Sequence, residues 1–269
     1  MFTRVAVGRA RVVREVRAAG PLMARLRAPV TARGPWLTAV LNEGSARWPR
    51  ARPVAVVVEA HAQGRPEAVA FLELHRRGVQ TTVRLLGSAC APLPGGLPTA
   101  RLPAGDPAVA ELLAAGVMEL LGSLRGPSTL RLTGLPLGDP TVRALAARLP
   151  TAVVANERSR RLIDGLDGVG DVQRSHDPVL LERWLPSLLS AAPPRSRRFL
   201  RAAARLHAAI GQLELAVISD GETLRAGLLT LVDGADRWPW WGTTSIGGLS
   251  TEMGAPLVSL IVPARRWPA

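Results

Sequence analysis

The residue types best suited to binding an anion gather near the end of the chain, between residues 246 and 254. Gly247, Gly248 and Gly254 leave the backbone bare, and Ser250 and Thr251 add hydroxyl groups. The apolar run at 253–262 predicts a helix directly after this loop. Bare backbone N–H groups and the positive end of a helix dipole together suit a phosphate group. The sequence therefore predicts that these five residues bind a phosphate-bearing cofactor.

Two carboxylates are candidates for a general base at this loop. Glu252 lies at the entrance of the predicted helix, where a carboxylate also interacts favourably with the helix dipole. Glu214 lies on a predicted strand in opposite phase to Leu213 and Leu215, which favours a place on the solvent face. We predict Glu252 as the catalytic residue.

The histidines and the cysteine point away from metal chemistry. His61, His75, His176 and His207 form no pair at metal-ligand spacing, and the sequence contains no Gly-x-Ser-x-Gly elbow. The single Cys90 excludes both an internal disulfide and a cysteine-cluster zinc site. No metal site is predicted.

Three strands are predicted ahead of the glycine loop, at 212–219, 223–232 and 237–244. Asp220-Gly221 and Asp233-Gly234 separate them, and such dipeptides favour type I′ hairpin turns. Pro239 lacks an N–H group, so the third strand is predicted to be splayed or to lie at a sheet edge. Trp238, Trp240 and Trp241 on this strand suit either a core or an acyl pocket.

The run from 211 to 266 resembles the acyltransferase domain of GNAT proteins. The likeness is carried by the hairpin at 221–227, by the tryptophan-rich third strand and by the small-residue stretch at 253–256. It is similar to the tandem-domain branch that includes cellulose-biosynthesis-type acetyltransferases and Fem-type aminoacyl transferases. The family's pyrophosphate loop usually reads Arg/Gln-x-x-Gly-x-Gly/Ala, and this chain has no Arg or Gln at that start.

The order of predicted elements supports a tandem arrangement. Residues 52–156 are predicted as three antiparallel strands, helix, strand, helix and strand, and residues 177–269 as helices, three antiparallel strands and a helix. A helical segment at 1–51 precedes them, and a linker at 157–176 joins them. We predict an α/β (α+β) fold of two GNAT-like units, each a mixed, mainly antiparallel sheet flanked by helices. The second unit is expected to lack its last strand, or to receive it from the N-terminus or from another molecule.

The resemblance implies an acyltransferase that moves an acyl group from acyl-CoA to an amine or hydroxyl acceptor. The acceptor would be a small molecule or a cell-envelope precursor. One alternative is a Fem-like transferase that uses aminoacyl-tRNA, with tRNA as a partner. The other is a non-catalytic GNAT-fold binding protein. A homodimer is compatible with the missing strand.

The composition limits the class of protein. The hydrophobic fraction of 47 % is that of a globular chain. The net charge of +13 comes from arginine without any lysine, as GC-rich coding produces, or else marks a basic surface for an anionic partner. No apolar run approaches the roughly 18–20 residues of a membrane span, and the start lacks a secretory signal. We expect a cytoplasmic protein.

Overall fold

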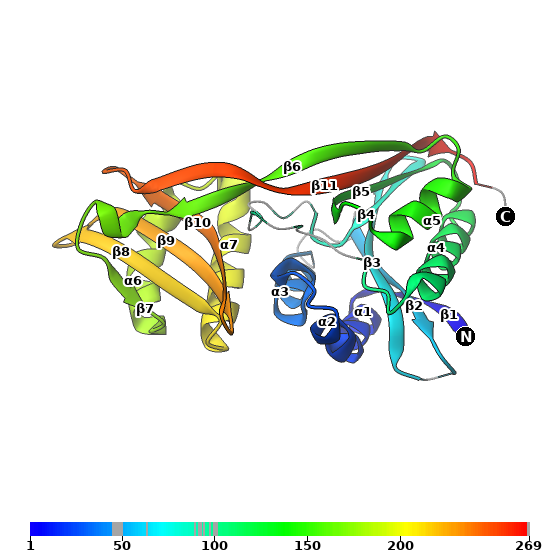
Figure 1. Ribbon diagram of the computed structural model, residues 1–269, viewed down its shortest axis with the longest axis horizontal. Coiled ribbons are helices and arrows are strands. Elements are labelled where there is room, and N and C mark those ends of the chain that lie inside the picture. The colour runs from blue at the N-terminus through cyan, green and yellow to red at the C-terminus, as the bar shows by residue number, and fades with distance from the viewer. Residues whose placement is uncertain are drawn as a thin grey trace. The chain divides into compact units, whose positions relative to one another are not determined.

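The computed structural model describes residues 1–44, 51–62, 64–88, 90, 93, 95, 96, 98 and 102–267. It divides into two compact units (Figure 1). Unit 1 comprises Met1–Ala89, Ala100–Glu157 and Pro256–Ala269, and unit 2 comprises Cys90–Thr99 and Arg158–Ala255. A large mixed sheet and a smaller antiparallel sheet, both flanked by helices, confirm the predicted α/β class. Among the described helices, none is long and apolar enough to cross a membrane.

Unit 1 is built on a seven-stranded sheet with the order β1-β2-β3-β4-β5-β11-β6. Its elements are β1 (Phe2–Val7), α1 (Arg9–Ala18), α2 (Gly20–Arg25), the 3-10 turn η1 (Val30–Ala32), α3 (Gly34–Gly44), β2 (Ala51–Glu59), β3 (Pro66–Arg77), β4 (Gln80–Leu85), α4 (Pro107–Gly122), β5 (Ser128–Pro136), α5 (Pro140–Arg148) and parts of β6 (Val153–Asp164) and β11 (Leu249–Arg265). Strands β1 to β4 are antiparallel neighbours, and β4 pairs with β5 in parallel. The predicted three-stranded meander and the two helices after it are thereby confirmed.

The two faces of this sheet differ because neighbouring residues of a strand point to opposite sides. Thr3 lies against Gly116 of α4, whereas Arg4 pairs with Glu15 of α1. We call these the α4 face and the α1 face. The α4 face carries the apolar core, formed by alternate strand residues and by the inner sides of α4 and α5. Its strand members are Val54, Val56, Val58, Ala68, Ala70, Leu72, Val83, Leu85, Leu130, Leu132, Leu135, Val258, Leu260 and Val262.

Helix α4 begins where the sequence provides a strong start signal. The Asp106 side chain accepts a hydrogen bond from the Val109 backbone N–H at 2.9 Å, and Pro107 occupies the first turn. Asp139 caps α5 in the same way, with its side chain accepting from the backbone N–H groups of Thr141 and Val142. These caps fix where the two helices that cover the α4 face begin.

Unit 2 is built on a four-stranded antiparallel sheet with the order β10-β9-β8-β7. Its elements are η3 (Leu166–Gly168), β7 (Gln173–Ser175), α6 (Pro178–Ser190), α7 (Pro194–Ala209), β8 (Leu213–Asp220), β9 (Thr223–Asp233) and β10 (Asp236–Thr244). Helices α6 and α7 pack on one face, where Leu188 of α6 lies close to Gly227 of β9. Strand β10 lies at the end of the order with a register shift between Pro239 and Trp241, so the edge strand predicted from Pro239 is confirmed.

The helix predicted at 253–262 is wrong, because these residues belong to strand β11. Val258, Leu260 and Val262 pair with β5 and enter the core of unit 1. A short apolar run rich in β-branched residues is compatible with a helix or a strand. Here the run is a strand, because it pairs with β5 in the gap between β5 and β6. Unit 2 therefore has no helix after β10 among its described residues.

The observed division of the chain also differs from the predicted boundaries. The segment 1–51 is not a separate helical piece, because β1 joins it to the sheet of unit 1 as the neighbour of β2. The predicted linker 157–176 contains the second part of β6, η3 and β7. The second unit was expected to lack a strand after the predicted helix, but the residues of that helix form β11, which lies in the sheet of unit 1.

Gly116 makes a testable close contact in the core of unit 1. A Cβ at this position would lie 2.4 Å from Thr3 Cγ2 and 2.8 Å from Val56 Cγ1. We expect Gly116→Ala to lower the free energy of unfolding by about 1–3 kcal/mol, although alanine is the better helix former. Urea denaturation measures this change. Gly20→Ala is the matched control, because its added Cβ meets no atom within 4 Å, and a loss of similar size there would contradict the packing argument.

Candidate functional site

The residues predicted to bind a cofactor lie around the start of β11. Gly247 and Gly248 form the turn after β10, with φ of 87° and 83°. Ser250, Thr251 and the predicted base Glu252 are exposed on β11. Because the expected helix is absent, the helix dipole no longer supports an anion site here.

Close packing accounts for two of these glycines without a ligand. A Cβ on Gly254 would lie 2.3 Å from Ser159 Oγ and 2.8 Å from Gly96 Cα. A Cβ on Gly248 would lie 2.6 Å from Val169 Cγ2, and the Gly248 carbonyl accepts a hydrogen bond from the Gly165 N–H at 2.8 Å. Donor binding at these positions stays a prediction.

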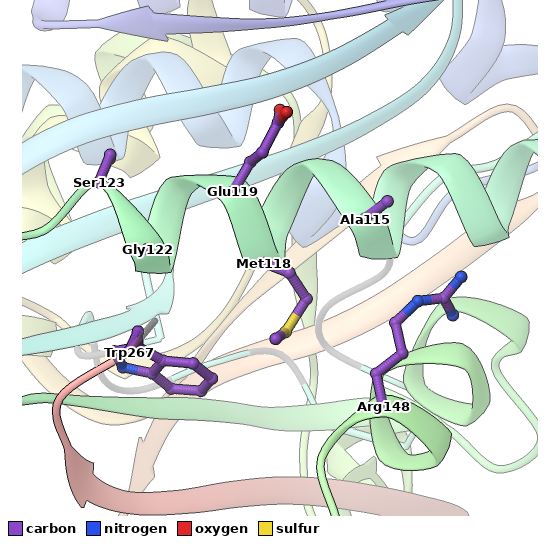
Figure 2. A pocket seen from close by; sticks show the side chains of 7 residues that line it. All are labelled: Ala115, Met118, Glu119, Gly122, Ser123, Arg148 and Trp267. Atoms are coloured by element: carbon purple, nitrogen blue, oxygen red, sulfur yellow. The ribbon is translucent and has the colours of Figure 1, made fainter. Parts of the chain in front are cut away.

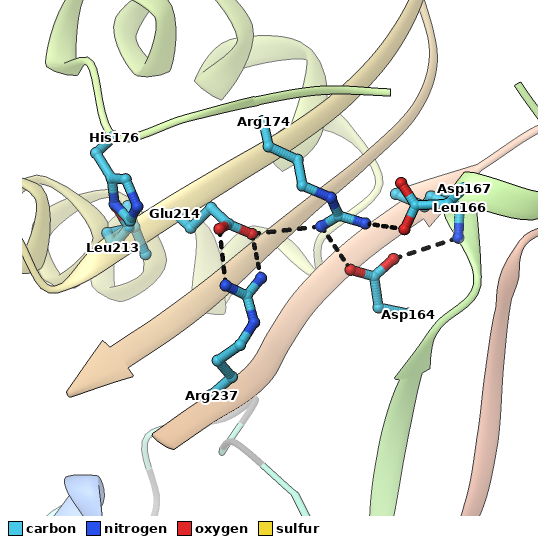
Figure 3. A network of polar contacts seen from close by, with 8 residues as sticks. All are labelled: Asp164, Leu166, Asp167, Arg174, His176, Leu213, Glu214 and Arg237. Atoms are coloured by element: carbon cyan, nitrogen blue, oxygen red, sulfur yellow. Dashed lines mark hydrogen bonds and ion pairs between the residues drawn. The ribbon is translucent and has the colours of Figure 1, made fainter. Parts of the chain in front are cut away.

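We predicted Glu214 on the solvent face, and this prediction is wrong. The residue is 6 % exposed and belongs to a charged network of unit 2 (Figure 3). Arg237 donates to both of its carboxylate oxygens, one at 2.8 Å through Nη1. Arg174 donates to Glu214 at 3.3 Å and to Asp164 and Asp167 at 2.7 Å each. With both oxygens occupied, Glu214 holds strands β7, β8 and β10 together and is not available as a general base.

The charges of this network shift the protonation of its members. Burial raises the pKa of Glu214, but the hydrogen bonds and charges of Arg237 and Arg174 outweigh burial and lower the pKa below its usual value. The hydrogen bond that Arg174 donates to Asp164 is the main cause that raises the pKa of Arg174. Outside this network, His207 of α7 is fully buried, and burial lowers its pKa to about 4.

The lowered pKa of Glu214 predicts an acid-sensitive fold. Its ionised form stabilises the native state above the unfolded-state pKa of about 4.3, and this contribution disappears as the pH falls through the folded-state pKa. We expect wild type to be more stable than Glu214→Gln above about pH 5, with the difference shrinking below about pH 4. Urea denaturation across pH tests this. The exposed Glu222→Gln is the control, and an equal acid loss in Glu214→Gln would contradict the assignment.

A second candidate site lies in unit 1, where strands β4 and β5 part. Their parallel ladder runs from the pair Thr81–Ser128 to the pair Arg84–Arg131 and ends there among the described residues. Strand β5 continues to Pro136 in partnership with β11 on its other side. Backbone groups of β5 beyond Arg131 are thus left without a strand partner on the β4 side in the described part of the chain. We call this point the β4–β5 fork.

Strand β5 is irregular directly after the fork. Gly134 has a φ of 74°, and the register shifts so that Leu132 to Leu135 of β5 oppose Leu260 to Val258 of β11. One extra residue on β5 is the mark of a β-bulge, and bulges re-aim backbone and side chains next to active sites. The fork and the bulge therefore occur on consecutive residues.

Polar side chains from five neighbouring strands cross the α1 face at this level. On four of these strands the polar side chains alternate with core residues and so point away from α4, and the fifth, on β6, is hydrogen-bonded to one of the four. We name them the polar strip: Glu73 of β3, Arg84 of β4, Arg131 of β5, Ser259 of β11 and Glu157 of β6. The Ser259 hydroxyl donates to Glu157 Oε1 at 2.7 Å, and Ser259 is 5 % exposed. A hydroxyl bonded to a carboxylate can pass on a proton.

Sequence reasoning missed the polar strip, although one signal was available. Strand β5 is paired on both sides, and an internal strand beside a parallel partner is normally apolar throughout. Arg131 breaks this pattern between Leu130 and Leu132. The partners Ser259 and Glu157 could not be found, because residues 253–262 were assigned to a helix.

Two hollows in unit 1 lie apart from the polar strip, and no residue of the polar strip lines either of them. One of about 620 Å³ is bounded by α4, by Arg148 of α5 and by Trp267, with Met118 and Trp267 facing each other across it (Figure 2). The other, of about 480 Å³, lies between α1 and the β1–β2 edge and is lined by Arg4, Glu15 and Glu59 among others. In the described part of the chain, no group of three His, Cys, Asp or Glu residues could hold a metal ion.

Comparison with known families bears on unit 2 first. Residues 158–246 match the acetyltransferase (GNAT) domain. The match covers the end of β6 through β10 and thus most of the four-stranded sheet with its two helices. Unit 1 lies outside this match. No curated protein matches the chain in sequence.

Several solved structures align with this chain at low identity and low TM-score. A tandem GNAT protein from the clavulanic acid biosynthesis pathway aligns with a TM-score of 0.45 and 15 % identity over 97 % of this chain and 98 % of its own. A GCN5-related N-acetyltransferase from Sphaerobacter thermophilus aligns at 0.35 and 13 % over 97 % and 94 %. A probable N-acyltransferase from Enterococcus faecalis aligns at 0.35 and 8 % over 96 % and 72 %.

Proposed function

We propose that this protein transfers an acyl group from acyl-CoA to an amine or hydroxyl acceptor, and that unit 1 carries the reaction. The single observation that supports this location is the β4–β5 fork, where the parallel ladder ends at Arg84 and Arg131. In GNAT proteins a strand opens beside its neighbour so that free N–H groups meet the pantetheine of the donor. The GNAT match at 158–246 supports the class of reaction.

The proposed chemistry needs an acyl thioester and one proton acceptor. The acceptor's nitrogen or oxygen attacks the thioester carbonyl carbon, the new bond forms, and the carbon–sulfur bond breaks to release the thiolate. A backbone N–H at the fork would polarise the carbonyl. The proton of the acceptor would pass through the Ser259 hydroxyl to Glu157, and the thiolate takes up a proton when it leaves.

The N-terminus of α4 does not fit a pyrophosphate. The Asp106 carboxylate already occupies it through the Val109 N–H, Pro107 offers no N–H, and a second anion would meet a like charge. This observation favours a second candidate function, a GNAT-fold protein that binds a ligand without acyl transfer. The Fem-like use of aminoacyl-tRNA is a further outcome that the donor screen below separates.

The acyl-transfer proposal is tested by following release of the CoA thiol from acetyl-CoA with a panel of amines. We expect Glu157→Gln to lower kcat by roughly 10²–10⁴-fold with little change in the donor KM, because a lost proton acceptor acts in the transition state. Ser259→Ala is expected to lower kcat in the same direction. Unchanged turnover in Glu157→Gln would contradict the location in unit 1.

The matched control is Glu252→Gln, which removes the base predicted from the sequence. If the reaction instead used the loop at 246–254, Glu252→Gln would lose turnover, and the double variant Ser250→Ala/Thr251→Ala would weaken donor binding. These three side chains are exposed, so the variants leave the packing intact. Thermal stabilisation by charged tRNA but not by acetyl-CoA would favour the Fem-like reaction, and no response to either donor would favour the non-catalytic protein.

A further inference from the structure

Arg84 and Arg131 lie directly opposite each other on neighbouring strands, as the last pair of the β4–β5 ladder. Both side chains lie on the α1 face, since Val83 and Leu130 beside them face the α4 core. Like charges in opposite positions of a sheet repel and destabilise it. A negative charge between the two guanidinium groups would therefore reduce their repulsion.

The described residues supply only part of that charge. Glu73, opposite Arg84 on β3, is 8 % exposed and accepts one long hydrogen bond of 3.3 Å from Arg84 Nη2. Arg84 Nε is buried and has no hydrogen-bond partner among the described residues. Arg131 is exposed and forms no ion pair within the described part of the chain. Among the described residues of β3, β4 and β5 in this row, Glu73 is thus the one carboxylate beside two guanidinium groups. Glu157, the other carboxylate of the polar strip, lies two strands beyond Arg131 and accepts from Ser259, so a further anion beside Arg131 would pair its charge.

We propose that Arg84 and Arg131 together bind the carboxylate of the acyl acceptor, which is an amino acid or a similar amino carboxylate. This inference rests on the proposed function, because it places the acceptor at the β4–β5 fork. Two planar guanidinium groups suit the two oxygens of one carboxylate, and the buried Nε of Arg84 offers an unused donor. The anion relieves the repulsion between the two arginines.

The position of the polar strip limits the size of this acceptor. Ser259 lies on β11, the next strand after that of Arg131, and Glu157 lies on the strand after that. Neighbouring strands are about 4.8 Å apart, so an amine within a few bonds of the carboxylate reaches the Ser259–Glu157 pair. An amine without a carboxylate would leave the charges of Arg84 and Arg131 unbalanced. An amine many bonds away from its carboxylate would not be placed at the Ser259–Glu157 pair.

A binding experiment tests the anion site without any turnover. Arginine Nε–Hε signals are followed by NMR while sodium acetate replaces sodium chloride at constant ionic strength. We expect the Arg84 signal of wild type to shift in a saturable way, and the shift to be lost in Arg131→Gln. Arg77→Gln, an exposed arginine at the end of β3, is the matched control and keeps the shift. A shift that survives in Arg131→Gln, or saturation by phosphate well below the acetate concentration, overturns the carboxylate site.

A turnover experiment tests the acceptor class. With acetyl-CoA as donor, we expect wild type to prefer an amino acid over its carboxamide by on the order of 10–100-fold in kcat/KM, since the amide leaves the charge unpaired. Arg131→Gln should remove this preference and leave the donor KM unchanged, whereas Arg77→Gln should keep it. Equal rates with acid and amide, or a loss that falls on the donor KM, overturn the inference while acyl transfer stands. Absence of turnover with every acceptor overturns the proposed function, and the acetate titration then decides the anion site alone.

Discussion

The insertion of β11 between β5 and β6 is the constraint on which the rest of unit 1 depends. Residues from the end of the sequence fill a gap in a sheet whose other strands come from the first 164 residues. Val258, Leu260 and Val262 complete the core beneath α4 and α5. The same strand supplies Ser259 to the opposite face and continues the polar strip from Arg131 to Glu157. Core and candidate site thus rely on one strand and its register.

A second constraint concerns which side chains lie on a sheet face and which elements cover that face. In unit 1 the α4 face is apolar because two capped helices lie on it. In unit 2, Glu214 lies on the sheet face opposite α6 and α7. Its carboxylate accepts hydrogen bonds from Arg237 and Arg174. On the same face Ala216, Ile218, Ala226 and Leu228 form an apolar cluster with Leu166 of η3, so this face combines an apolar core with a charged network.

The sequence predicted elements well where local signals were strong. Asp-Pro pairs mark the start of α4, α5 and α6, and Asp-Gly pairs mark the turns of the second meander. It failed at residues 253–262, where an apolar run fits two structures and only a distant partner strand decides between them. The failure carried over to the site, because the anion loop at Gly247 and Gly248 depended on that helix. Glu214 was misplaced for a related reason: alternation gives the two faces of a strand but not which of them is covered.

The path of the chain through β6 and β11 has a consequence for how the protein is made. Both strands pass from one unit to the other, so residues 158–255 are inserted within the sequence of unit 1. During synthesis all strands of unit 2's sheet leave the ribosome before β11 does. Unit 1, although it contains the N-terminus, can close its sheet only when the final residues appear. Its folding is governed by contacts as distant as Arg131 with Ile261, which slows folding and leaves a strand edge of β5 open during translation. Without residues 256–265, unit 1 would therefore lack the strand between β5 and β6.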